Sequence, residues 1–307
     1  MPHTQQVVAV RDTHLFVDDT GEEGLPIILC LHSLFLDSRM FDGLIDAVRG
    51  EFRVVRPEFR GQGRSDLHDV DVITMDDDAE DILALIEVMG LKDINMLVQS
   101  MGGDVGVRVA ARRPELFRKI VMAGSSARGE THKEYVTWTD RASVHGFVGD
   151  ILEETLGVMF GETIRNDPER TDIVALWTDR INALPRSLRP AMLGVMTREG
   201  ALDLLPSITC PVLIVSGVED HARPPGVGQR SRRCPPRQRT RRSRRRRSQP
   251  DLGSTKHRLS KDHRLLPILS CPGTQFAEGR NYSIERNIRR GTLRAKLICN
   301  PGWSRAE

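Results

Sequence analysis

Short apolar runs alternate with longer amphipathic stretches through about the first 225 residues. Continuous apolar runs lie at 26–31, 94–98, 119–124 and 211–217. Runs of this length without polar alternation are typical of strands that helices cover on both faces. The pattern therefore predicts an α/β fold with a doubly wound, mostly parallel sheet.

Helical periodicity separates these strands. The spacing predicts helices over 39–50 and 74–90. Thr74 precedes the second of them as an N-cap residue, with Asp77 three positions later, and Gly90 is suited to end it.

The strand pattern is absent from 126–206, where amphipathic helices are predicted instead. Helices inserted between two strands of an α/β sheet commonly form a lid over the active site. The chain thus divides into a core (1–125), a helical lid (126–206), a core strand with its following loop (207–225) and a remainder (226–307).

The remainder differs from the rest in charge. Residues 226–307 hold 22 Lys and Arg against 5 Asp and Glu, whereas the preceding residues hold 23 against 37. This basic segment has no repeating apolar face, so it is predicted to be irregular and disordered. Such a segment is expected to bind nucleic acid only non-specifically, through phosphates. The sheet is expected to end at 211–217 with an open edge.

Several classes of protein are not favoured by the composition. No run of about 18 uncharged apolar residues is present, and the first residues do not resemble a signal peptide, so a cytoplasmic protein without membrane contact is expected. The five cysteines follow no spacing typical of zinc sites and are odd in number. Neither a disulfide framework nor a metal site is therefore predicted.

Ser100 is the candidate nucleophile. It stands in Leu-Val-Gln-Ser-Met-Gly-Gly, directly after the apolar run 94–98. A serine on a tight turn between a strand and a helix needs small neighbours, which Gly102 and Gly103 provide. Val98 departs from the general sequence pattern of such a nucleophile turn, which has glycine two residues before the serine.

Three further stretches, together with this one, resemble the α/β-hydrolase superfamily from the N-terminus to about Pro225. His-Ser-Leu at 32–34 resembles the oxyanion loop, with Ser33 in place of glycine. Residues 56–66 resemble the D-x-R-G-x-G-x-S loop, with glutamate at the acidic position, and 215–225 resemble the segment that carries the triad acid. The resemblance implies Asp220 as that acid, and the backbone N–H groups of Leu34 and Met101 as the oxyanion hole.

The resemblance also implies a histidine base after a last apolar strand. The late segment offers His257 and His263, but neither follows a strand-like run or a glycine. His32 is expected to be structural, and His221 is too close in sequence to Asp220 to be oriented by it. The catalytic base is therefore the partner that no motif of the sequence identifies, and whether His257 or His263 acts as the base stays open.

Eleven arginines between Arg230 and Arg247 suggest a cause. Alanine codons of a GC-rich gene, read one base out of register, give arginine codons. We hypothesise that a frameshift near Gly226 replaced the last strand, the base and the final helix. Resequencing tests this, because an alternative frame must then encode an apolar strand followed by Gly-His.

Among branches of the superfamily, the pattern is most similar to 3-oxoadipate enol-lactonase-like serine hydrolases. This implies hydrolysis of a small-molecule ester or lactone through an acyl-enzyme on Ser100, without metal or cofactor, and impaired if the histidine is lost. Two alternatives remain open. One is a meta-cleavage type hydrolase of C–C bonds, and the other is a non-catalytic protein whose basic tail binds nucleic acid.

Overall fold

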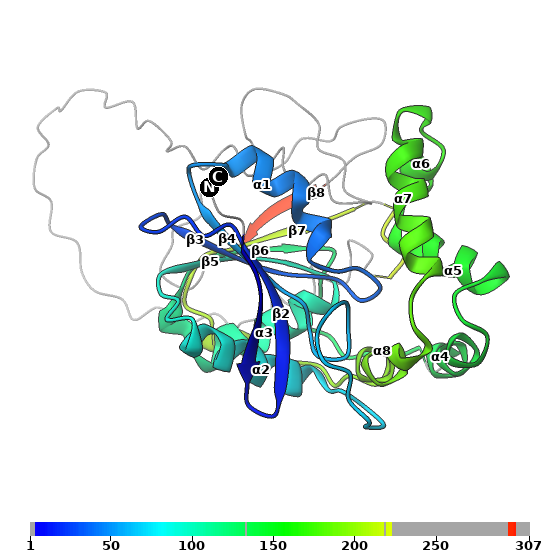
Figure 1. Ribbon diagram of the computed structural model, residues 1–307, viewed down its shortest axis with the longest axis horizontal. Coiled ribbons are helices and arrows are strands. Elements are labelled where there is room, and N and C mark those ends of the chain that lie inside the picture. Colours follow the sequence, from blue (N-terminus) through cyan, green and yellow to red (C-terminus); the bar gives the residue numbers. More distant parts are fainter. Residues whose placement is uncertain (1–3, 133, 218, 223–293, 299–307) are drawn as a thin grey trace, which may run out of the picture.

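A twisted sheet with helices on both sides forms the centre of the molecule (Figure 1). The computed structural model describes residues 4–132, 134–217, 219–222 and 294–298. Within them, eight strands form one sheet in the order β1-β2-β4-β3-β5-β6-β7-β8. The strands from β4 to β7 in this order are parallel, as the continuous apolar runs predict.

The strands have the following bounds in chain order: β1 (Thr4–Val10), β2 (Thr13–Asp19), β3 (Ile27–Leu31), β4 (Arg53–Pro57), β5 (Ile94–Gln99), β6 (Phe117–Ala123), β7 (Val212–Ser216) and β8 (Arg294–Ile298). β1 and β2 form an antiparallel hairpin, and β2 also pairs antiparallel with β4. The doubly wound α/β fold predicted from the sequence is confirmed.

Helices of the core cover both faces of the sheet. They are α1 (Asp42–Val48), α2 (Met75–Val88) and α3 (Met101–Arg112), with the 3-10 turns η1 (Ser38–Phe41) and η2 (Pro114–Leu116). In Figure 1, α2 and α3 lie on one side of the sheet and α1 on the other. The loops at the carboxyl ends of the parallel strands are thereby left to form a site.

The segment between β6 and β7 is helical, as predicted. Its elements are α4 (Glu134–His145), α5 (Gly149–Met159), α6 (Glu162–Arg165), η3 (Pro168–Arg170), α7 (Thr171–Asn182), η4 (Arg186–Leu188), α8 (Arg189–Met196) and η5 (Leu205–Ser207). Figure 1 shows α4 to α8 grouped to one side of the sheet. We call this segment, 126–206, the helical cap.

The start of α2 follows from its sequence. The Thr74 hydroxyl accepts a hydrogen bond from the N–H of Asp77 (3.1 Å), and the Asp77 carboxylate accepts one from the N–H of Thr74 (2.9 Å). This reciprocal capping box satisfies N–H groups that the first helical turn leaves unpaired. Gly90, with φ of 61°, ends the helical stretch as predicted.

The two ends of the helical cap are joined to each other. The N–H of Ala201 donates to the carbonyl of Ala127 (2.8 Å), and the N–H of Glu130 donates to the carbonyl of Arg198 (3.1 Å). The Arg198 side chain is buried and forms ion pairs with Asp104 of α3 (3.3 Å) and with Glu130 (3.2 Å). These contacts hold the two ends of the helical cap together and against α3, the helix that follows Ser100.

The expectation of an open sheet edge beside β7 is wrong. β8 pairs antiparallel with β7, from Val212 opposite Ile298 to Ser216 opposite Arg294. An unpaired edge leaves backbone N–H and C=O groups without partners, and a short added strand satisfies them. The sequence Arg-Ala-Lys-Leu-Ile of β8 has no continuous apolar run like those that predict the other strands, which explains why the sequence does not predict it.

Other predictions for 226–307 lie outside the described residues. They concern the disorder of 226–293 and 299–307, the binding of polyanions, the origin of the segment in a frameshift, and the roles of His257 and His263. At 294–298 the prediction of irregular structure is wrong, because these residues form β8. Within the described residues, no helix is long and apolar enough to cross a membrane.

The buried carboxyl group of Asp78 in α2 makes the free energy of unfolding depend on pH. Its carboxyl is fully buried and neither oxygen has a hydrogen-bond partner among the described residues. Burial, and next the negative charge of Asp81, raise the pKa of Asp78 well above 3.8. Between about pH 4 and the folded-state pKa, the carboxyl group of Asp78 is ionised in the unfolded chain but protonated in the folded chain. The contribution of Asp78 to the free energy of unfolding is therefore greatest below about pH 4 and is lost as the pH rises toward the folded-state pKa.

We expect Asp78→Asn to be more stable than the parent at pH 7, by about 1.4 kcal/mol for each unit by which the pKa is raised. The gain should shrink as the pH approaches 4. Urea unfolding at several pH values measures it, with the exposed Asp46→Asn as a control. A gain that does not change with pH would contradict a raised pKa.

Candidate active site

Ser100 lies on a sharp turn between β5 and α3. Its φ of 47° and ψ of −115° are unfavourable for a residue other than glycine. The turn is held by hydrogen bonds from the N–H of Ser100 to the carbonyl of Ala123 (3.1 Å) and from the N–H of Gly103 to the carbonyl of Ser100 (2.8 Å). A strained serine at the N-terminus of a helix is the geometry of a nucleophile elbow.

The glycines after Ser100 are required by close packing. A Cβ on Gly102 would lie 2.3 Å from the carbonyl oxygen of Leu31, and a Cβ on Gly103 would lie 2.3 Å from the Oγ of Ser125. The N-terminus of α3 therefore rests directly on the end of β3. The loop that follows β3 therefore lies next to the turn at Ser100.

Val98, which stands where the usual pattern has glycine, is also accommodated. It is fully buried, and a Cβ on Gly106 of α3 would lie 3.0 Å from its Cγ1. The small residue that this crossing needs is therefore supplied by the helix instead of the strand. The departure at Val98 does not disturb the elbow.

His32 holds the loop after β3. Its Nδ1 lies 2.9 Å from the carbonyl oxygen of Ser33, and its Nε2 accepts a hydrogen bond from the N–H of Phe59 (3.0 Å). The accepting Nε2 requires the proton to be on Nδ1, which then donates to Ser33. Complete burial lowers the pKa of His32, so the ring is neutral. Both nitrogens are occupied, and His32 is structural as predicted.

This arrangement orients the N–H that the sequence predicts for the oxyanion hole. The Ser33 carbonyl also accepts from the N–H of Leu36 (3.2 Å). Because the peptide bond is planar and trans, the N–H of Leu34 points away from that carbonyl. The N–H of Met101 is the first of α3 and has no acceptor within the helix. Both residues are buried beside the elbow, Leu34 at 4% and Met101 at 0% exposure.

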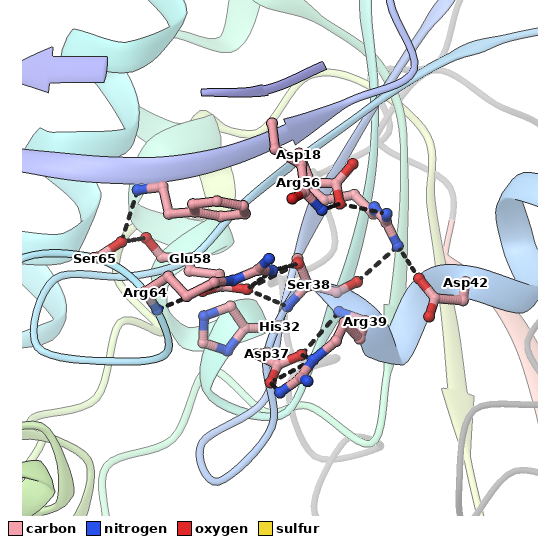
Figure 2. A network of polar contacts seen from close by, with 12 residues as sticks. Asp18, His32, Asp37, Ser38, Arg39, Asp42, Arg56, Glu58, Arg64 and Ser65 are labelled. Atoms are coloured by element: carbon pink, nitrogen blue, oxygen red, sulfur yellow. Dashed lines mark hydrogen bonds and ion pairs between the residues drawn. The ribbon is translucent and has the colours of Figure 1, made fainter. Parts of the chain in front are cut away.

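Glu58 ties the loop after β3 to the loop after β4 (Figure 2). Its buried carboxylate accepts hydrogen bonds from the Ser38 hydroxyl (2.8 Å) and from the N–H and guanidinium of Arg64 (both 2.6 Å). Burial alone would raise the pKa of Glu58, but the hydrogen bonds from Arg64 outweigh it and the pKa is lowered. Gly63 is needed here, since a Cβ would lie 2.1 Å from the carboxylate.

Arg56 also holds the loop after β3 in place. It is 1% exposed and forms ion pairs with Asp18 (2.9 Å) and Asp42 (2.6 Å), and it donates to the carbonyl of Ser38 (2.9 Å). Figure 2 shows this guanidinium beside Ser38, next to the contacts of Glu58. Two buried charge networks therefore hold the start of α1 and the preceding loop in place.

Asp220 lies in the loop after β7. Its N–H donates to the carbonyl of Gly217 (3.3 Å), and a Cβ on Gly124 would lie 3.1 Å from its Oδ2. The carboxylate thus reaches the end of β6, the strand next to β5. Asp220 and Ser100 line the same cavity, which has a volume of about 60 Å³. The structure brings the predicted nucleophile and acid to one site.

The helical cap closes one side of this cavity. Val158 and Met159, at the end of α5, contribute apolar walls. Glu219, beside Asp220, accepts hydrogen bonds from the N–H of Thr163 (3.0 Å) and from its hydroxyl. The cap is therefore attached to the acid loop as well as to α3.

No histidine among the described residues lines the cavity. His14, His68 and His132 bond to Asp66, Thr13 and Glu134, and His145 and His221 are exposed. The described residues also contain no group of His, Cys, Asp and Glu that could hold a metal ion. They therefore present a serine and an acid, but no base between them.

Sequence reasoning missed several residues of the cavity. Ser33, noted only as a substitution, lines it together with Gln99 and Glu219. Gln99 and Glu219 are direct neighbours of Ser100 and Asp220, so their position along the chain was a usable signal. Val158 and Met159 gave none, because an amphipathic helix does not reveal which residue faces a distant strand end.

Comparison with known proteins adds independent information. Residues 26–244 match the family described as alpha/beta hydrolase fold, and the match ends within the basic segment. 3-Oxoadipate enol-lactonase 1 of Acinetobacter baylyi is 22% identical over 218 residues, covering 71% of this chain and 80% of the relative.

Two solved structures are similar over about three quarters of the chain. A thermophilic esterase from Thermogutta terrifontis is 28% identical with a TM-score of 0.65, covering 74% of this chain and 85% of the esterase. The enol-lactonase from Burkholderia xenovorans is 23% identical with a TM-score of 0.67, covering 74% and 86%. The second likeness concerns the fold alone.

Proposed function

Because the chain belongs to the α/β-hydrolase fold family, we propose that it is a serine hydrolase in which Ser100 attacks the carbonyl carbon of a carboxylic ester or lactone. The observation that carries this proposal is the strained backbone of Ser100 at the N-terminus of α3, in a cavity that Asp220 also lines. An esterase and an enol-lactonase among the similar proteins support this class of substrate.

In the proposed reaction, the Ser100 Oγ forms a bond to the carbonyl carbon and loses its proton to a histidine base, the residue type that the family resemblance implies and that the described lining of the cavity does not contain. The carbonyl oxygen becomes an anion, which the N–H groups of Leu34 and Met101 stabilise. The anion then collapses and expels the alcohol, or opens the lactone ring, and the proton passes to the departing oxygen. Water afterwards hydrolyses the acyl-enzyme by the same steps, and no cofactor is needed.

Asp220 acts in this scheme by orienting the base and stabilising its cation. His32 and Glu58 take no part in the bond changes. Their hydrogen bonds hold the loop after β3, so the Leu34 N–H is already oriented when the substrate binds. Donors fixed in advance contribute more than donors that must reorganise during the reaction.

A fluorophosphonate probe tests the nucleophile. We expect weak covalent labelling of the parent chain, no labelling of Ser100→Ala, and parental labelling of Ser207→Ala, an exposed serine outside the cavity. Intact-mass spectrometry measures the labelled fraction over time. Equal labelling of the parent and Ser100→Ala would remove Ser100 from the mechanism.

A further inference from the structure

Two polar side chains in the cavity have unused hydrogen-bonding capacity. The Oγ of Ser33 and the Oε1 of Gln99 are buried and have no hydrogen-bond partner among the described residues. Both residues line the cavity that contains Ser100, and Ser33 is only 1% exposed. Leaving such groups unpaired is unfavourable, so binding favours a molecule that donates a hydrogen bond to the Oε1 of Gln99 and pairs with the hydroxyl of Ser33.

The fold does not need these two groups for its own support. The Ser33 carbonyl is held by His32 and Leu36, which leaves its hydroxyl without a structural role. The hydroxyl of Ser38, in the same loop, donates instead to Glu58 (2.8 Å). A serine hydroxyl that supports the fold is thus partnered here, whereas that of Ser33 is not.

Gln99 is fixed next to the proposed reacting atom. It is the last residue of β5, paired in register with Ala123 of β6, and it directly precedes Ser100. Its Oε1 has no hydrogen-bond partner among the described residues, so it can accept a hydrogen bond from a molecule in the cavity. The amide offers two N–H donors and one acceptor.

The rest of the cavity limits what it can hold. A volume of about 60 Å³ is well below the roughly 300–1,000 Å³ of sites for drug-sized ligands. Val158 and Met159 provide apolar walls, and the charged groups among the described lining residues are the carboxylates of Glu219 and Asp220. A short, uncharged group fits these conditions better than a long or anionic one.

We propose that Ser33 and Gln99 form a polar subsite, which selects short, neutral acyl groups that carry a hydroxyl group near the carbonyl under attack. That hydroxyl group donates a hydrogen bond to the Oε1 of Gln99 and accepts one from the Ser33 hydroxyl. An alkyl chain of the same length leaves both groups unpaired, which is how polar sites reject apolar analogues. The inference rests on the proposed function, since it places the acyl group beside Ser100.

Protection of Ser100 from the fluorophosphonate probe tests the subsite without requiring turnover. 1-Hydroxy-2-butanone and 3-pentanone differ by a hydroxyl group in place of a methyl group, and both are neutral. We expect 1-hydroxy-2-butanone to protect the parent chain at about tenfold lower concentration, the effect of one good hydrogen bond. The more apolar 3-pentanone would protect better if only burial mattered.

In Gln99→Met, and separately in Ser33→Ala, this preference should fall toward one or reverse, while Ser207→Ala keeps it. Thermal melting shows which variants are folded, and two independent variants keep the test decisive if one is not. Equal protection of the parent by both ketones, or a preference that survives in both variants, would overturn the subsite alone. Absence of any labelling at Ser100 would overturn the proposed function and the subsite with it.

Discussion

Hydrolysis of p-nitrophenyl butyrate by the full chain should be about 10³ to 10⁶ times slower than by a serine hydrolase with a complete triad. The reason is that the described residues place no base beside Ser100. Serine stays protonated at neutral pH unless a base takes its proton, and no described histidine reaches the cavity of Ser100 and Asp220. The oxyanion donors and substrate binding alone then provide the remaining acceleration.

Steady-state release of p-nitrophenol from the parent and from Ser100→Ala measures this directly. We expect nearly equal rates, because little triad function remains to be lost. A high rate that disappears in His257→Ala or His263→Ala would contradict the expectation. It would mean that the basic segment delivers a base to Ser100, and the frameshift hypothesis would fail with it.

Gly102→Ala should lower the free energy of unfolding by about 3 kcal/mol. Its Cβ would lie 2.3 Å from the carbonyl oxygen and 2.7 Å from the carbonyl carbon of Leu31, and 2.8 Å from the carbonyl oxygen of His32. These are backbone atoms, which cannot rotate aside, so α3 must move away from β3. The movement also separates the N–H groups of Leu34 and Met101, and labelling of Ser100 should fall.

Gly43→Ala is a matched control for this substitution. Nothing lies within 4 Å of a Cβ at Gly43, which sits in α1 with an ordinary helical backbone. Alanine should stabilise this helix by up to about 1 kcal/mol. Urea unfolding of both variants gives the comparison, and Gly102→Ala as stable as Gly43→Ala would show that the contact between α3 and β3 is not close.

Local chemistry explains which parts of the fold are predictable. The strands at 94–98 and 211–217, and the helix capped by Thr74, follow from continuous apolar runs and from hydrogen bonds within a few residues. The elbow at Ser100 is of the same kind, because strand, turn and helix are contiguous. Such features are encoded by neighbouring residues and survive in any context that buries the strand.

Features made by distant segments were not predictable. β8 is defined by its pairing with β7 across about 80 residues of chain, and not by a strong pattern of its own. Likewise, Met159 reaches the cavity only because Glu219 and Thr163 hold the cap against the acid loop. Periodicity reports which face of an element is buried, but it does not report what lies opposite.

The location of the covalent adduct tests the central claim that Ser100 is the nucleophile. Cleavage after Lys92 and Arg108 gives the peptide 93–108, in which Ser100 is the one residue with a hydroxyl or thiol group. After reaction with the fluorophosphonate probe, tandem mass spectrometry should place the added mass on this peptide, at Ser100. An adduct confined to other peptides, with 93–108 unmodified, would contradict the account.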